Sequence, residues 1–226
     1  MSTHEYEEPE FRRFASPPCF LHELQPEYQP ERQDKKAADV PATWPEIARW
    51  RKAERARLLE NRLSILPDER KALSERIAAK LDTVIGDVEG RLVSLYWPFR
   101  GEPDLRGWMA AIIQRGGWIA LPVVIRKGWP LEFRAWRPGE PLQRGLWNIL
   151  VPSHGPAVWP SVVIAPLVGF DQSKYRLGYG GGFFDRTLAV MPRKPLVIGV
   201  GFAESRVATI HPQPHDIPMD TIVTEE

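Results

Sequence analysis

The sequence predicts an α/β fold: a mostly parallel sheet with helices on both faces, Rossmann-like and three-layered, preceded by an N-terminal helical hairpin. Near-continuous apolar runs, such as residues 162–168 and 196–200, alternate with helical segments, which is typical of parallel strands buried on both faces. In addition, all seventeen glycines lie at or after Gly86, so a change in composition separates the leading helices from the strands and turns.

The first ordered segment is predicted to be the hairpin. Thr43 and Glu46 form a capping box in front of a run of good helix formers over residues 47–63. Pro67 then begins a second helix, and its apolar residues recur at helical spacing and predict one buried stripe: Leu73, Ile77, Leu81 and Val84.

The α/β part follows from residue 91 onward. The apolar runs predict strands over residues 92–97, 118–124, 131–136, 162–168 and 196–200. Helices are predicted over residues 104–114 and about 184–191.

Residues 1–42 are predicted to form an extended N-terminal tail, because they contain six prolines among polar residues and no sustained apolar period. Within the tail, Cys19 and its neighbour His22 lie in a short apolar segment, for which docking onto the body or a partner is favoured over a metal or nucleophile role. Residues 43–226 are then predicted to form a single α/β domain.

Composition and charge narrow the function classes. The 226 residues have a formal net charge of +1, and a basic excess, the usual mark of a nucleic-acid-binding protein, is missing. No apolar run approaches the roughly 20 residues that span a bilayer. One cysteine cannot form an internal disulfide, and the N-terminus is acidic where a signal peptide is basic. We therefore expect a cytoplasmic protein with small-molecule substrates and with neither nucleic acid nor membrane as partner; its oligomeric state is open.

The segment over residues 170–186 carries the strongest functional signal. A glycine-rich loop follows a buried strand and opens a helix, the place where parallel sheets bind ligands. Its glycines let successive N–H groups converge on an anion, while Arg176 could bind a phosphate and Asp185 a Mg²⁺ ion. The loop lacks the Gly-Lys-Ser/Thr of a Walker A motif, and Phe183 stands where a dinucleotide fingerprint has its third glycine.

The string Arg-Leu-Gly-Tyr-Gly-Gly-Gly-Phe-Phe-Asp-Arg at residues 176–186 closely resembles the signature of the 5-formyltetrahydrofolate cyclo-ligase family, also called 5,10-methenyltetrahydrofolate synthetase. Other blocks resemble the family in order and spacing, and together they cover about residues 46–226. These blocks lie at residues 96–102, 121–122, 147–149 with 152, 165–171, 215–216, 220 and 224–225.

The resemblance implies an ATP-dependent cyclo-ligase. Family members use ATP and Mg²⁺ to convert 5-formyltetrahydrofolate into 5,10-methenyltetrahydrofolate, ADP and phosphate. The formyl oxygen is thought to be phosphorylated first, after which N10 of the folate attacks the activated carbon and the ring closes. Such chemistry needs two well-positioned ligands and neutralised phosphate charge rather than a protein nucleophile.

The resemblance also implies roles for individual residues. Asp185 and Asp216 would bind the metal, and Glu102, Trp97 and Trp147 would contact the folate. The ATP phosphates would be bound by Arg176, with a catalytic role, and by the loop residues Gly178, Tyr179, Gly180, Gly181, Gly182 and Phe183. The first helix of the family carries a basic pair that reaches ATP; Arg51 and Arg55 match it best, and Lys52, one position away, is the alternative to Arg51. A solvated basic face is the competing interpretation of this helix.

Three departures from the family pattern leave an alternative open, and one of them is that the tail before Thr43 is longer than in compact members. Val151 stands where many relatives have a polar residue, and Phe184 stands where tyrosine is frequent. A paralogue that binds folate or nucleotide without this catalysis is therefore the second hypothesis, and a nicotinamide-dependent dehydrogenase, disfavoured by the missing third glycine, is the third. His211 and His215 have a spacing of four, but the prolines around them disfavour a helical metal site, and a role in orienting Asp216 is preferred.

Overall fold

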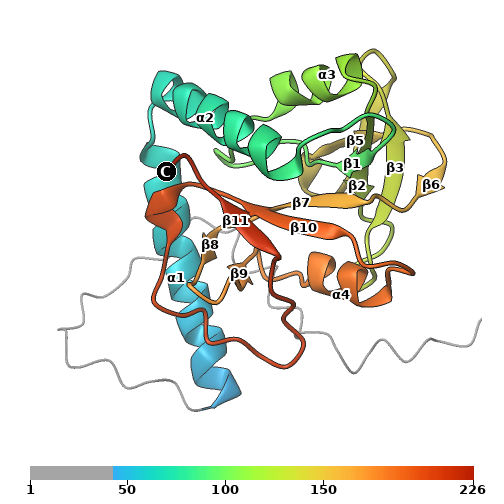
Figure 1. Cartoon of the computed structure of the whole chain (residues 1–226). Helices are drawn as coiled ribbons and strands as arrows, with labels where there is room; N and C mark the ends of the chain where they lie inside the picture. Colours follow the sequence, from blue (N-terminus) through green and yellow to red (C-terminus); the bar gives the residue numbers. More distant parts are fainter. Residues whose placement is uncertain (1–42) are drawn as a thin grey trace, which may run out of the picture.

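The computed structural model describes residues 43–226, and Figure 1 shows how their helices and strands are arranged. The predicted tail, with its segment around Cys19, falls on residues 1–42 and lies outside the described residues. That residues 43–226 form a single domain stays a prediction. Within the described residues, no helix is both long and apolar enough to cross a lipid bilayer.

Two long helices open the described chain, α1 (Trp44–Ser64) and α2 (Pro67–Ile85). The capping box of α1 is present, since the Glu46 carboxylate accepts a hydrogen bond from the Thr43 backbone N–H at 2.9 Å. In α2 the predicted buried stripe is wrong at Val84, which is 42% exposed. Residues four apart lie on the same face of a helix, so the stripe that contains Ile77 and Leu81 continues to the buried Ile85. Both helices and their short link are as predicted, while their packing as a hairpin stays a prediction.

A seven-stranded sheet forms the centre of the molecule, in the order β11-β10-β7-β1-β2-β3-β6. The first five of these strands are mutually parallel: β11 (Thr221–Val223), β10 (Leu196–Val200), β7 (Val162–Pro166), β1 (Leu92–Ser94) and β2 (Trp118–Val123). The last two, β3 (Glu132–Trp136) and β6 (Ala157–Val158), pair antiparallel with their predecessors. Residues 124–131 are too short a connection for the crossover that a parallel β3 needs.

Helices cover both faces of the sheet, as predicted (Figure 1). Because side chains alternate along a strand, Val162 and Ile164 of β7 join the core beneath α2 and α3 (Arg106–Gln114). Val163 and Ala165 belong to the core on the other face, against which α4 (Phe183–Val190) packs with Phe184 and Leu188. The near-continuous apolar runs are thus explained by burial on two faces.

Small elements that the apolar pattern did not predict surround the carboxyl edge of the sheet. Strands β4 (Leu142–Arg144) and β5 (Leu150–Pro152) form one hairpin around the 3₁₀ turn η3 (Leu146–Asn148), and β8 (Gly169–Phe170) and β9 (Arg176–Leu177) form another. A second 3₁₀ turn, η4 (Ala203–Ser205), follows β10. These elements contain two or three residues each, too few to show a period in the sequence.

Strand β1 ends earlier than its apolar run. The sequence predicts a strand to Trp97, but ladder pairing stops at Ser94. Pro98 cannot donate a ladder hydrogen bond, and Arg100 and Gly101 have positive φ angles of 46° and 73°, so the chain turns away from the sheet. This turn places residues 96–102 beside the carboxyl ends of the neighbouring strands.

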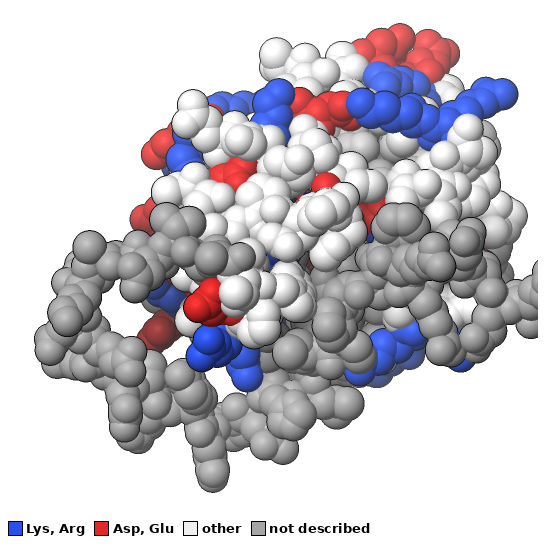
Figure 2. All heavy atoms as spheres, turned by 90° about the horizontal axis from the view of Figure 1, so that it is seen from below, with Lys and Arg blue, Asp and Glu red and all other residues white. Residues whose placement is uncertain are grey.

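Charged side chains of both signs are distributed over the face shown in Figure 2, which is seen from below relative to Figure 1. Among the residues described there, acidic and basic side chains are interspersed around a broad uncharged area. This distribution agrees with the formal net charge of +1.

Candidate active site

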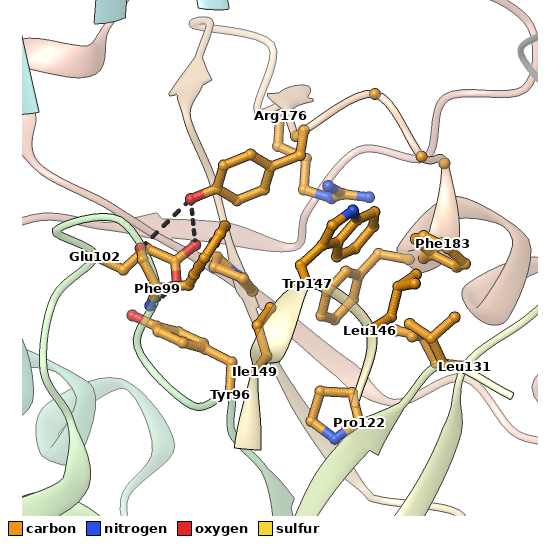
Figure 3. Close-up of a pocket in the computed structure, with 18 of the residues that line it drawn as sticks. Tyr96, Phe99, Glu102, Pro122, Leu131, Leu146, Trp147, Ile149, Arg176 and Phe183 are labelled. Atoms are coloured by element: carbon orange, nitrogen blue, oxygen red, sulfur yellow. Dashed lines mark hydrogen bonds between the residues drawn. The ribbon is translucent and has the colours of Figure 1, made fainter. Parts of the chain in front are cut away.

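A pocket of about 430 Å³ lies at the carboxyl ends of β1, β2 and β7, where a parallel sheet is expected to bind its ligand. Its wall combines the segment after β1, the end of β2, the η3 turn, the glycine loop and side chains of α1. Figure 3 shows Glu102, Phe99 and Tyr96 on one side of the pocket and Arg176, Trp147 and Phe183 on the other. The volume is typical of a small-molecule site.

The glycine loop, residues 178–182, forms one wall of this pocket and leads directly into α4. Gly180 and Gly182 have φ angles of 90° and 60°, which favour glycine, and Gly182 is the N-cap of α4. A Cβ on Gly181 would come within 2.7 Å of the Phe183 ring. The glycines thus let the backbone run close to Phe183 beside the positive end of the helix dipole, which suits an anion.

Arg176 and Asp185 face each other across the start of α4. The Arg176 guanidinium is 9% exposed and donates from Nη2 to Asp185 Oδ2 at 2.8 Å, while it lies 5.1 Å from the Phe184 ring centre. Its buried Nε has no hydrogen-bond partner among the described residues. The structure therefore brings together a cation and a carboxylate that the sequence predicted in one site.

Arg51 of α1 binds the C-terminal segment. Its Nε and Nη2 donate to the carbonyls of Ile210 and His211, each at 2.9 Å, and its guanidinium forms an ion pair with Asp216. The next N–H along the chain, that of Ile217, donates to Asp185 Oδ1 at 3.2 Å. The backbone that follows Asp216 therefore lies against the Asp185 carboxylate, although 30 residues of sequence separate these two predicted metal ligands.

The alternatives on α1 differ in position. Arg55 lines the pocket and donates from Nε to the Gly178 carbonyl at 2.7 Å, and Arg51 also lines it. Lys52 is exposed and lies outside the lining. Arg57 is paired with Glu54 on the outer face of α1, so the helix has one basic face toward the pocket and another toward solvent.

Glu102 is 4% exposed and has both carboxylate oxygens engaged. Oε2 accepts the Phe99 backbone N–H at 2.9 Å, and Oε1 accepts the Tyr179 hydroxyl at 3.1 Å. Burial raises the pKa of Glu102 to about 7, although the nearby Arg62 guanidinium and the two hydrogen bonds favour the charged form. Glu102 is thus a buried carboxyl group that titrates near neutrality.

Both predicted tryptophans line the pocket. Trp147 has a φ of 55° and is followed by Asn148 at 62°, two consecutive left-handed residues that are uncommon outside glycine. Its ring packs edge-on to Phe183 at 5.8 Å, and Trp97 packs edge-on to Trp136 at 5.9 Å. Strain of this kind gathers at functional sites, so Trp147 is the stronger candidate for a ligand contact.

Two of the departures from the family pattern are in the pocket wall, and the third, the longer tail, lies outside the described residues. Val151 is buried on β5, and Phe184 lies beneath the Arg176 guanidinium; both side chains line the pocket. His215 lines it as well, with Nε2 3.9 Å from Asp216 Oδ1. That distance is compatible with the predicted orienting role, which stays a prediction.

Asp185 and Asp216 suit Mg²⁺ only when a bound phosphate compound supplies further oxygen atoms to the ion. Within the described residues there is no group of three or more His, Cys, Asp or Glu side chains able to bind a metal. Mg²⁺ is commonly bound by one or two carboxylates together with substrate phosphates and water. Asp185 and Asp216, which both line the pocket, fit that donor set.

Four residues of this region escaped the sequence reasoning. Tyr96 and Phe99 line the pocket, Arg186 donates twice to the Gly181 carbonyl at 2.6 and 2.8 Å, and Arg62 is buried behind Tyr179. For Arg62 a signal existed: it lies two helical turns after Arg55 and four residues after the buried Leu58. The competing interpretation of a solvated basic face is wrong for Arg62, which is 7% exposed.

The sequence matches a known family model along most of its length. The model of the 5-formyltetrahydrofolate cyclo-ligase family covers residues 47–225. A 5-formyltetrahydrofolate cyclo-ligase of Mycolicibacterium smegmatis is 29% identical over 182 residues, which are 75% of this chain and 91% of that relative. One from Escherichia coli K12 is 27% identical over 172 residues, 73% of this chain and 94% of that relative.

Solved structures of methenyltetrahydrofolate synthetases share the fold. The Aquifex aeolicus 5,10-methenyltetrahydrofolate synthetase superposes with a TM-score of 0.68 at 27% identity, covering 78% of this chain and 90% of the other. The Mycoplasma pneumoniae synthetase, at 22% identity, superposes with a TM-score of 0.65 and covers 78% and 99%. Because the family model matches residues 47–225, most of the 226 residues, the chain belongs to the 5-formyltetrahydrofolate cyclo-ligase family of ligases.

Proposed function

We propose that this protein converts 5-formyltetrahydrofolate and ATP into 5,10-methenyltetrahydrofolate, ADP and phosphate in the presence of Mg²⁺. The observation that carries the proposal is the pocket, which unites an anion-binding loop with a buried carboxyl group and aromatic walls. Membership of the cyclo-ligase family supports the same reaction. A pocket for ATP alone would have no evident use for Glu102 and Trp97.

The nucleotide phosphates occupy the side of the pocket formed by the glycine loop. Backbone N–H groups at the start of α4 and the guanidinium groups of Arg176, Arg51 and Arg55 neutralise their charge. Arg176 has the catalytic role, because its buried guanidinium can follow the charge that develops on the transferred phosphoryl group. We assign the contact on α1 to Arg51 rather than Lys52, since only Arg51 lines the pocket.

Asp185 and Asp216 would bind Mg²⁺ together with phosphate oxygens. When bound, the ion supplies charge neutralisation between the phosphate groups. Without it, each acid is paired with an arginine, Asp185 with Arg176 and Asp216 with Arg51. These pairs fix the positions of the carboxylates, so the chain supplies a preformed site for the metal–nucleotide complex.

The folate occupies the side that contains Glu102. The carboxylate accepts hydrogen bonds from pterin N–H groups, while Trp97, and Trp147 from the opposite side of the pocket, provide flat apolar surface for the rings. The formyl oxygen attacks the γ-phosphorus of ATP and ADP leaves. N10 then attacks the activated carbon and loses its proton, and the C–O bond breaks to release phosphate. The protein contributes position and charge rather than a nucleophile.

An absorbance assay for methenyl folate tests the reaction. We expect product only when 5-formyltetrahydrofolate, ATP and Mg²⁺ are all present. No ATP-dependent product at saturating substrates, combined with measurable binding of either ligand, would overturn the catalytic proposal. That result would favour the paralogue that binds without catalysis, for which Val151 and Phe184 in the pocket wall give the structural reason.

Replacing Arg176 tests its catalytic role. Arg176→Ala removes the buried guanidinium, so kcat should fall by a factor on the order of 10² or more. Arg126→Ala, at an exposed position outside the pocket lining, serves as the control and should leave kcat unchanged. Equal turnover of both variants would show that Arg176 has no part in the reaction.

A further inference from the structure

A buried arginine behind the pocket supports one wall of the site. Arg62 of α1 is 7% exposed and donates from Nε to the Arg100 carbonyl at 2.9 Å and from Nη1 to the Leu167 carbonyl at 3.2 Å. Its Nη2 donates to the Tyr179 hydroxyl. Three acceptors from three segments thus fix the guanidinium, and Arg62 itself does not line the pocket.

The Tyr179 hydroxyl has one proton to donate, and its surroundings decide where that proton goes. Because the oxygen accepts a hydrogen bond from Arg62, the O–H bond is directed to the other side. There it meets Glu102 Oε1 at 3.1 Å and the Phe99 carbonyl at 3.5 Å, the contacts drawn as dashed lines in Figure 3. The nearer, charged acceptor is preferred. Burial and the neighbouring carboxylate raise the pKa of Tyr179, so the hydroxyl remains a donor.

The Glu102 carboxylate is consequently fixed at both oxygens. Tyr179 donates to Oε1, the Phe99 backbone N–H donates to Oε2 at 2.9 Å, and each oxygen retains a second lone pair. The left-handed turn at Arg100 and Gly101 places Glu102 in this position. A carboxylate presented in this way suits a partner with two adjacent N–H donors, as at the aminopyrimidine edge of a pterin.

We propose that Tyr179 and Arg62 are positioning residues which orient Glu102 for the pterin, so that one side chain of the glycine loop determines affinity for the folate. This inference rests on the proposed function. It differs from the role given to the loop backbone, since the Tyr179 side chain serves the folate rather than the nucleotide. A hydroxyl that merely anchored the loop would affect the binding of ATP instead.

The test is removal of the hydroxyl alone, in Tyr179→Phe, with Tyr175→Phe as the matched control. Tyr175 lies on the same segment, but it does not line the pocket. Titration with 5-formyltetrahydrofolate, followed by tryptophan fluorescence, should show a Kd about tenfold higher in Tyr179→Phe and unchanged in Tyr175→Phe. The Kd for ATP should stay within about twofold of wild type in both variants.

Arg62 is tested through the same hydroxyl. Arg62→Lys keeps the charge but cannot reach three acceptors, so we expect weaker folate binding, with Kd raised about three- to tenfold. In the double variant with Tyr179→Phe the two effects should not multiply, because both act through one hydrogen bond. Thermal melting verifies that each variant is folded. If Arg62→Lys fails to fold, the comparison of Tyr179→Phe with Tyr175→Phe decides the question.

The outcomes separate this inference from the proposed function. If ATP binding weakens as much as folate binding in Tyr179→Phe, or if folate binding is unchanged, the positioning role is overturned. If wild type binds folate without forming product, only the proposed function fails, and the ratio of affinities still decides the role of Tyr179. A wild-type protein that binds no folate overturns both.

Discussion

Arginine side chains of the site have two distinct functions, and their hydrogen bonds separate them. Arg176 and Arg51 are paired with the acids Asp185 and Asp216 in the pocket wall, where a phosphate can share their charge. Arg62 and Arg186 donate to carbonyls and to the Tyr179 hydroxyl from behind the wall. In the proposed function the first pair binds the ligand, and the second pair holds the surrounding backbone in place.

Glu102 predicts a pH dependence for the reaction. In the proposed function its carboxylate form accepts the pterin N–H groups, and burial raises its pKa to about 7. We therefore expect kcat/KM for the folate, measured from pH 5.5 to 9 at saturating ATP, to fall about tenfold per unit below pH 7. In Glu102→Gln this acidic limb should vanish at a lower plateau. An identical limb in the variant would assign the titration to another group.

The same shift predicts how stability depends on pH. Because the pKa of Glu102 is higher in the folded than in the unfolded state, folding favours its protonated form. The corresponding stabilisation is present below the unfolded pKa and is lost as the pH rises through about 7.

Asp185 predicts a change in metal dependence. Asp185→Asn removes one of the two proposed metal carboxylates, so the Mg²⁺ concentration for half-maximal rate should rise on the order of tenfold. The matched control is Asp104→Asn, which removes a carboxylate paired with Arg106 outside the pocket. Titration of Mg²⁺ at fixed ATP measures both variants. An unaltered requirement in Asp185→Asn would remove this residue from the metal site.

At the scale of elements, helix α1 and the loop before α4 contribute more to the site than any strand does. Helix α1 presents Arg51, Arg55 and Arg62 along one face, and each binds a different segment around the pocket. In the proposed function the loop brings backbone rather than side chains to the nucleotide, and its glycines allow this close approach. A side chain at Gly181 would collide with the Phe183 ring, and Gly182 has a positive φ angle that favours glycine.

A single methyl group tests the glycine loop. In Gly181→Ala the new Cβ would lie 2.7 Å from the Phe183 ring, so either the ring or the loop must move. We expect KM for ATP to rise on the order of tenfold, equivalent to about 1.4 kcal/mol of binding. Gly107→Ala in α3 meets no atom within 4 Å and should leave KM unchanged. Equal KM values for both variants would show that the loop backbone does not approach the nucleotide.

At the scale of the whole molecule, the pocket exists only where separate segments meet. Side chains after β1 and β2, the η3 turn, the glycine loop and α1 each form part of its wall. Three core clusters support these segments, and the largest joins α2 and α3 to the sheet. The site is therefore a product of the assembled residues 43–226.

Deletion of residues 1–40 tests whether the tail contributes to catalysis. Among the described residues the pocket wall begins with Arg51 of α1, and the family match begins at residue 47. We expect kcat and both KM values within about twofold of the full chain, measured by the methenyl folate assay. A loss of activity in a truncated protein that still melts cooperatively would give the tail, and the segment around Cys19 in particular, a part in the site.

Local patterns in the sequence determined the fold class, the extent of the long helices, the glycine loop and its flanking Arg176 and Asp185. These follow from periodicity, capping and backbone freedom, which act over a few neighbouring residues. The short elements β4, β5, β8 and β9 contain too few residues for a period, and the antiparallel β3 depended on the length of its connection.

Only the tertiary structure decided which side chains meet. It placed Arg51 beside Asp216, put Lys52 outside the pocket, and buried Arg62 behind the Tyr179 hydroxyl that binds Glu102. Contacts between residues 77 to 165 positions apart depend on how the helices and strands pack, and no local pattern contains that information. The raised pKa of Glu102 also depends on the tertiary structure, because the whole fold buries this carboxyl group.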